Sequence, residues 1–143
     1  MKTILSLVLI TFITFNLSAQ EKYLGDKSQT EQLSKRVVEL FKANKISESV
    51  KELAPYWPIA QNEIESFEEK TIKYMNLIND NYGSAIGTLK IREETISDIG
   101  IRETYLIRFR NTALRLKFTF YKNDKGWILN SFKWDDSFTE EFK

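Results

Sequence analysis

The sequence predicts an α+β fold, in which three N-terminal helices precede a four-stranded antiparallel sheet. As far as Gly83, apolar residues recur at intervals of three and four, which is the spacing of one buried helix face. From Ala85 onward apolar and polar residues alternate, which is the pattern of strands. Because the helices come first, the strands follow and the connections are short, an antiparallel meander is favoured over alternating βαβ units.

The first two helices are marked by local start and stop signals. Residues 28–31, SQTE, match a capping box, so the first helix is expected to begin there and to end at Asn44. A shorter helix should start at Ser47 and end before Pro55, since the residue that precedes a proline disfavours helix.

A rigid corner, PYWP at residues 55–58, separates the second helix from the third and longest one. Pro58 is well placed to open that helix, and Gly83 is expected to end it. Tyr56 and Trp57 in the corner could line a pocket, although aromatic residues at this density more often fill a core.

Four strands with turn residues between them are expected after the helices. Their sequences are IGTLKIREETISDIG from residue 86, with a kink around Glu93-Glu94, IRETYLIRFRN from residue 101, ALRLKFTFYK from residue 113, and GWILNSFKWDD from residue 126. Residues 123–126, NDKG, are of the kind that a tight hairpin turn requires. In the second and third strands the apolar side chains share one face, so these strands have a clear inner side.

Only the fourth strand carries large apolar residues on both faces. By simple alternation the two faces hold Trp127 with Leu129, and Ile128 with Phe132 and Trp134. One explanation is that one set faces the helices and a partner subunit or the N-terminal segment covers the other. The second is a β-bulge at Asn130-Ser131 that shifts the alternation and turns all the large residues inward.

Three helices, a Tyr-Gly pair at residues 82–83 after the longest of them, and a meander that ends in GWILNSF together resemble the nuclear transport factor 2-like, or cystatin-like, fold. The resemblance covers residues 28–143 and extends to small exported bacterial proteins of unassigned function, many of which end in W-x-L-x-S-F-x-x-D-D. It implies a curved sheet wrapped into a cone around the helices. The concave side of such a cone holds the core and often a ligand pocket, and its outer side frequently forms a dimer.

Residues 1–19, MKTILSLVLITFITFNLSA, have the pattern of a cleaved signal peptide. Lys2 provides the positive start, an apolar run follows, and small residues precede the expected cleavage point. The apolar run is shorter than the ~20 residues that span a bilayer, so we expect no membrane span after cleavage. We therefore expect export to a periplasm or to the medium, a polar lead-in over residues 20–27 and one domain over residues 28–143. The chain has no cysteine, so no lipid can be attached at the cleavage point and a lipoprotein is not expected.

The missing residue types exclude several kinds of chemistry. The chain has neither histidine nor cysteine, which excludes Ser-His-Asp and Cys-His catalysis and zinc sites of the usual nitrogen and sulfur type. The five glycines are scattered and form no phosphate-binding loop. Without Lys2 the basic and acidic residues are equal in number, which disfavours a nucleic-acid partner. We expect no metal centre and no cofactor.

The resemblance also suggests the residues that an enzyme of this fold would use. Ketosteroid isomerases and polyketide cyclases place an acidic base and a tyrosine inside the cone, and the nearest counterparts here are Glu103 and Tyr105, two apart on the core-facing side of the second strand. A buried glutamate beside aromatic rings would have a raised pKa and could transfer protons near neutral pH. The favoured alternative is that Glu103 lies at a strand end, solvated or paired with an arginine.

Two further groups of residues are candidates for binding. The residues expected to line a pocket inside the cone are Tyr74, Tyr105, Phe109 and Trp127. The residues expected to form a basic outer face for an anionic partner are Lys90, Arg92, Arg108, Arg110, Arg115 and Lys117. A charged outer face is also the ordinary way in which an antiparallel sheet meets water, and this second interpretation is favoured.

Together these observations favour a non-enzymatic exported domain that binds a small apolar ligand or a protein partner. Self-association as a homodimer through the outer face of the sheet is expected with it. The alternatives are an enzyme of the isomerase or cyclase type that uses Glu103 and Tyr105, and a structural protein of the cell envelope.

Overall fold

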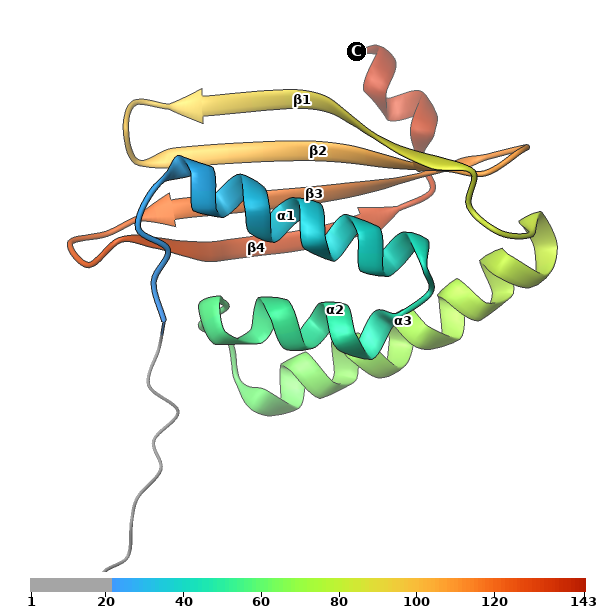
Figure 1. The fold of residues 1–143 in the computed structure, drawn as a ribbon, viewed down its shortest axis with the longest axis horizontal. Helices are drawn as coiled ribbons and strands as arrows, with labels where there is room; N and C mark the ends of the chain where they lie inside the picture. The colour runs from blue at the N-terminus through green and yellow to red at the C-terminus, as the bar shows by residue number, and fades with distance from the viewer. Residues whose placement is uncertain (1–21) are drawn as a thin grey trace, which may run out of the picture.

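The computed structural model describes residues 22–143, so the expected signal peptide and residues 20 and 21 lie outside the described residues. Helices come first and strands follow, as expected for an α+β fold (Figure 1). The elements are α1 (Lys27–Lys42), α2 (Ile46–Leu53), the short 3₁₀ helix η1 (Ala54–Tyr56), α3 (Gln61–Tyr82), β1 (Gly87–Ile96), β2 (Gly100–Arg108), β3 (Ala113–Lys122), β4 (Trp127–Asp135) and the 3₁₀ helix η2 (Phe138–Phe142).

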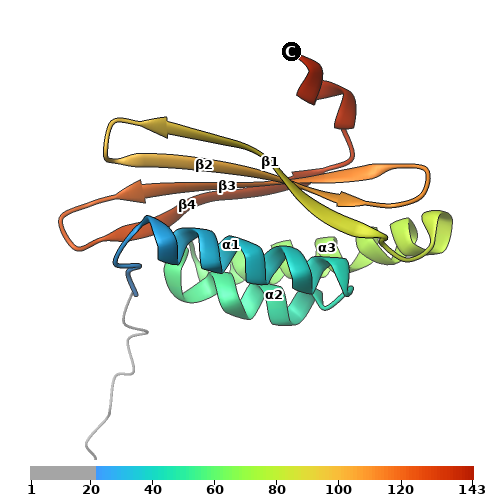
Figure 2. The same cartoon turned by 45° about the horizontal axis from the view of Figure 1, so that its top comes forward.

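The four strands form one antiparallel sheet in the order β1-β2-β3-β4, which confirms the expected meander. Helices α1, α2 and α3 cover one face of the twisted sheet, and η2 lies on the opposite side (Figure 2). We call these the core face and the outer face. None of the helices within residues 22–143 combines the length and apolarity that crossing a membrane requires.

The start of α1 differs from the expected one. The N-cap is Asp26, whose carboxylate accepts the amide of Gln29 at 2.8 Å, while the Gln29 side chain accepts the amide of Gly25 at 2.6 Å. Asp26 and Gln29 have the same spacing as the expected capping residues, Ser28 and Glu31, and cap the helix two residues earlier, so the prediction of Ser28 as the cap is wrong. The expected end is confirmed, since Asn44 has a φ of 56° and ends the helical conformation.

The third helix begins later than expected. It starts at Gln61, and the carboxylate of Glu63 accepts the amide of Ala60 at 3.1 Å. Pro58 therefore lies in the corner and does not open the helix, which corrects the prediction. Gly83 ends α3 with a φ of 73°, a conformation that glycine adopts without steric cost.

A β-bulge in β4 explains why this strand carried apolar residues on both faces. Thr119 pairs with Ser131 and Phe120 pairs with Leu129, so Asn130 is the extra residue. Leu129 and Phe132 are both buried, whereas Asn130 is exposed. The bulge hypothesis is confirmed for Trp127, Leu129, Phe132 and Trp134, which share the core face, but Ile128 pairs with Tyr121 and stays on the other face.

A second bulge interrupts β1. Lys90 pairs with Tyr105 and Arg92 pairs with Thr104, so Ile91 is the extra residue. The expected kink at Glu93-Glu94 is wrong by a few residues. Because side chains alternate between the faces, the bulge places Lys90 on the core face and Arg92 on the outer face.

An aromatic cluster around Phe132 joins the helices to the sheet. The Phe132 ring centroid lies 4.8 Å from that of Phe118, 5.6 Å from Phe41, 5.7 Å from Phe67 and 6.2 Å from Trp57. Three of these four contacts are edge-to-face, the arrangement that the ring quadrupoles favour. This cluster connects α1, α3, β3 and β4 to the corner between α2 and α3.

Candidate functional site

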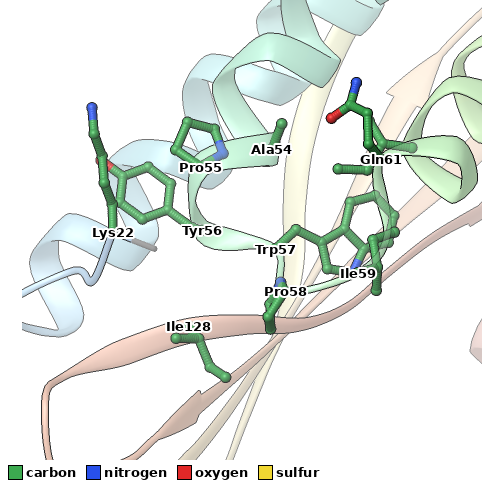
Figure 3. A pocket seen from close by; sticks show the side chains of 10 residues that line it. Lys22, Ala54, Pro55, Tyr56, Trp57, Pro58, Ile59, Gln61 and Ile128 are labelled. Carbon is green, nitrogen blue, oxygen red and sulfur yellow. The ribbon is translucent and has the colours of Figure 1, made fainter. Parts of the chain in front are cut away.

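A cleft of ≈ 680 Å³ opens at the corner between η1 and α3, beside the edge strand β4 (Figure 3). We call it the corner cleft. The residues that line it are Lys22, Ala54, Pro55, Tyr56, Trp57, Pro58, Ile59, Gln61, Ile64 and Ile128.

The first wall is the PYWP corner, which local sequence holds in a tight conformation. Pro55 lies in η1, and the Trp57 amide closes that turn on the carbonyl of Ala54 at 3.3 Å. The amide of Ile59 then bonds the carbonyl of Trp57 at 2.8 Å and turns the chain around Pro58. Two prolines in four residues restrict the backbone before any ligand binds.

Trp57 is the anchored side chain of this wall. Its ring packs edge-to-face against Phe67 at 5.4 Å and against Phe132 at 6.2 Å. The indole is therefore held by the core on one side and contributes to the cleft on the other.

The opposite wall comes from parts of the chain that are distant in sequence. Ile128 stands on β4 across from the corner (Figure 3). The segment before α1 runs along this edge, because Leu24 and Trp127 exchange two backbone hydrogen bonds of 2.9 Å and the Lys22 amide donates to the Pro55 carbonyl at 3.1 Å. The lining is apolar except for Lys22, Gln61 and the phenol of Tyr56, so its chemistry favours binding an apolar group over acid–base reaction.

The four residues expected to line one pocket are not brought together. Tyr105, Phe109 and Trp127 are buried in the core, whereas Tyr74 on α3 is 56% exposed to solvent. Neither the corner cleft nor a smaller hollow of ≈ 330 Å³ beside Asn44 and Ile72 is lined by any of them. Tyr56 and Trp57 were recognisable from the sequence, but Ile128 was missed because only the folded chain places it opposite them.

Glu103 and Tyr105 are close together and deeply buried. Glu103 is 0% exposed, the Tyr105 hydroxyl donates to its Oε2 at 3.4 Å, and the Lys90 ammonium lies 3.9 Å from its Oε1. The expectation that Glu103 would be solvated or paired with an arginine is wrong, since a lysine is its charged neighbour. Neither described cleft reaches this pair, so no path for a substrate joins it to either of them.

Burial changes the protonation of this group. It raises the pKa of Glu103, an effect that the hydroxyl of Ser34 and the charge of Lys90 only partly offset. Burial and the charge of Glu103 also raise the pKa of Tyr105, so its phenol stays protonated and acts as a donor. The pKa of Lys90 is lowered by burial but raised further by Glu93 and Glu103, and the net change is an increase.

The raised pKa of Glu103 predicts a dependence of stability on pH. The folded state holds this proton more tightly than the unfolded chain does, so the contribution of Glu103 to the free energy of unfolding is highest below the ordinary glutamate pKa of about 4.3 and falls as pH rises from there through the raised value. We expect Glu103→Gln to remove this loss. Its free energy of unfolding, relative to that of the wild type, should increase by about 1–3 kcal/mol as the pH is raised from about 4 to about 8. Urea unfolding across this range measures it. Glu94→Gln removes the charge of an exposed glutamate on β1 and is the control. A pH dependence for Glu103→Gln no larger than that for Glu94→Gln would contradict the prediction.

The six basic residues expected on one face divide into three groups. Lys90 points to the core face and contacts Glu31, Glu93 and Glu103. Arg108 and Arg110 are exposed near the turn between β2 and β3. The other three, Arg92, Arg115 and Lys117, meet on the outer face around the carboxylate of Glu141.

Within residues 22–143 the acidic side chains form no group of three that could hold a metal ion. Asp135 instead makes a two-pronged contact with the Arg115 guanidinium, with both distances at 2.7 Å. The Arg115 contact lowers the pKa of Asp135.

The fold is nuclear transport factor 2-like, as comparison with solved structures shows. A Campylobacter jejuni protein named an NTF2-like transpeptidase aligns with 71% of this chain and 97% of its own, with a TM-score of 0.50 and 15% identity. A DUF4783 family protein from Bacteroides ovatus aligns with 70% of this chain and 91% of its own, with a TM-score of 0.42 and 13% identity. No model of a known protein family matches the sequence, and no curated protein matches it significantly.

Proposed function

We propose that this chain is a non-catalytic binding domain whose corner cleft takes a small apolar or aromatic ligand. The observation that carries the proposal is the cleft itself, which is apolar, open and walled by an anchored tryptophan. Its volume of ≈ 680 Å³ falls within the ~300–1,000 Å³ of typical small-molecule sites.

The construction of the cleft also supports binding. Trp57 is fixed by Phe67 and Phe132, and the prolines at 55 and 58 restrict the backbone between η1 and α3. A wall that is ordered in advance loses little conformational entropy when a ligand enters. Lys22 and Gln61 are exposed, so they can contact a polar end of a ligand whose apolar part is buried.

The cleft is tested with 1-aminoanthracene, an apolar probe that fluoresces more strongly when it leaves water. We expect saturable binding to the wild type and an affinity lower by at least about tenfold in Ile128→Glu, because a carboxylate in an apolar cleft loses its hydration. Ile96→Glu is the matched control, since Ile96 is exposed at the far end of β1, and it should bind as the wild type does. Equal affinity of the two variants would refute the corner cleft as the site.

An apolar side chain of a protein partner would use the same cleft, which lies beside the edge strand β4. A partner peptide that competes with 1-aminoanthracene would show that the corner cleft binds a protein partner. A structural envelope protein would bind neither, and Ile128→Glu would then behave as Ile96→Glu does.

The proposal includes export and self-association. The apolar segment at residues 4–15 supports export, and recovery of a chain that begins at Gln20 from the periplasm or medium would establish it. Exposed apolar residues such as Leu89 and Tyr121 on the outer face support a homodimer, and sedimentation at twice the mass of the chain would establish that.

The isomerase or cyclase alternative has one observation in its favour, the raised pKa of Glu103. The pair of Glu103 and Tyr105 is buried away from the corner cleft. The arrangement therefore favours binding over catalysis.

A further inference from the structure

A second site lies on the outer face of the sheet, away from the corner cleft. Arg92, Thr104 and Lys117 are direct cross-strand neighbours there, on β1, β2 and β3. Lys133 of β4 continues the same row, and Arg115 stands two residues from Lys117 along β3. Like charges opposite one another, as at Lys117 and Lys133, disfavour the sheet unless an anion lies between or above them.

Two carboxylates neutralise these cations. Asp135 of β4 pairs with Arg115, and the second carboxylate is that of Glu141, carried by η2. Its Oε1 lies 2.7 Å from the Arg115 guanidinium and 3.5 Å from the Lys117 ammonium, and its Oε2 lies 2.6 Å from the Arg92 guanidinium. The side chain of Glu141 is only 5% exposed and that of Arg115 8%. Three cations therefore surround the buried carboxylate of Glu141, and its Oε1 accepts a hydrogen bond from Arg115. Charge-assisted hydrogen bonds are strongest where little water reaches them.

The two carboxylates do not satisfy all of this site. Thr104 is fully buried, it stands in register between Arg92 and Lys117, and its Oγ1 has no hydrogen-bond partner among residues 22–143. A buried hydroxyl without a partner is costly and uncommon. An anion with more oxygens than a carboxylate could accept from it.

The segment that supplies Glu141 is held mainly by this carboxylate. Phe138 and Phe142 of η2 contact each other, but both are exposed, Phe142 by 77%. Among residues 22–143, the other hydrogen bonds that join the segment to the sheet are from Arg92 to the Glu141 carbonyl at 3.3 Å and from the Ser137 amide to Asp135 at 2.8 Å. A short segment with so little buried apolar surface can be displaced by a competing anion.

We propose that Arg92, Thr104, Arg115 and Lys117 form a binding site for a phosphate group, which Glu141 occupies in the absence of that ligand. A phosphate group carries more charge than a carboxylate and has more acceptor oxygens. It can pair with the arginines and Lys117 and accept the free hydroxyl of Thr104 at the same time. The phosphate group is either free phosphate or the headgroup of an anionic lipid.

The decisive variant is Glu141→Gln, which removes the competing charge and keeps the shape of the side chain. The apparent affinity of a site is reduced by the fraction of molecules in which it is free to bind, and in the wild type Glu141 occupies the site. We therefore expect inorganic phosphate to bind Glu141→Gln at least about tenfold more tightly than the wild type. Calorimetric titration at constant ionic strength, on the chain without residues 1–19, measures the affinity.

Glu140→Gln is the matched control, because it changes the net charge equally in the same segment but the Glu140 partner is Lys143. It should bind phosphate as the wild type does, and Arg92→Ala added to Glu141→Gln should remove the gain. Equal phosphate affinity of Glu140→Gln and Glu141→Gln, with no binding of either to the vesicles described next, would overturn the proposal.

A second arm identifies the source of the phosphate group. Vesicles of phosphatidylglycerol, with phosphatidylcholine vesicles as the control, should sediment with Glu141→Gln more than with Glu140→Gln if the ligand is a lipid headgroup.

If Glu141→Gln does not fold, hydrogen exchange of the wild type replaces the titration. Phosphate or phosphatidylglycerol vesicles should then speed the exchange of amides in residues 136–143 relative to chloride of equal ionic strength, and no change with either would overturn the proposal.

Discussion

Insertion of one alanine between Ser131 and Phe132 is expected to abolish folding of the domain. Asn130 is already the one extra residue of the β4 bulge, so a further residue shifts every later residue of the strand to the opposite face. Phe132 and Trp134 would turn toward solvent, and Lys133 would turn toward the core.

The expected loss is comparable to the whole stability of a domain. Exposing a large apolar side chain costs about 1.5–3 kcal/mol, and the aromatic cluster would lose its central ring as well. Burying the ammonium of Lys133 without a partner costs several kcal/mol more. Together these approach the ~5–15 kcal/mol by which a domain of this kind is stable.

Substitution at the bulge separates the effect of the residue count from that of the side chain. Asn130→Ala keeps the residue count, and Asn130 is exposed with no positive φ, so we expect a change below about 1 kcal/mol. Circular dichroism and urea unfolding compare the two variants. Cooperative unfolding of the insertion variant near the wild-type midpoint would show that the residue count after the bulge does not set the facing of β4.

Substitution of Phe132 by alanine is expected to lower the free energy of unfolding by about 3–5 kcal/mol. Phe132 is buried and its ring contacts Phe41, Trp57, Phe67 and Phe118, so truncation leaves a cavity where the helices meet the sheet. Two-state urea unfolding measures the loss. Because Trp57 rests on Phe132, we also expect weaker binding of 1-aminoanthracene in the corner cleft.

Phe142→Ala is the control for this prediction. It makes the same chemical change on a side chain that is 77% exposed, so its effect should stay within about 0.5 kcal/mol. Similar losses for Phe132→Ala and Phe142→Ala would show that the aromatic cluster is not the main link between the two layers.

Phosphate binding and apolar binding would occur at separate places on this fold. The corner cleft lies beside β4 and involves α3, whereas the residues around Glu141 stand on the outer face of β1, β2 and β3. Ile128→Glu should therefore leave phosphate binding unchanged, and Glu141→Gln should leave probe binding unchanged.

By itself, the sequence determined the order and type of the elements. The spacing of apolar residues separated helices from strands, and Asn44, Gly83 and the NDKG turn marked ends that the structure confirms. These features depend on neighbouring residues along the chain, and local pattern is enough to predict them.

The tertiary structure alone decided which side chains meet. The bulges at Ile91 and Asn130 depend on the pairing of each strand with its neighbour, and a shift of one residue reverses the facing of all that follow. For this reason Lys90 joined Glu103 on the core face while Arg92 joined Glu141 on the outer face. The corner cleft likewise brings together Trp57 and Ile128, residues that are far apart in the sequence and carry no local signal of their contact.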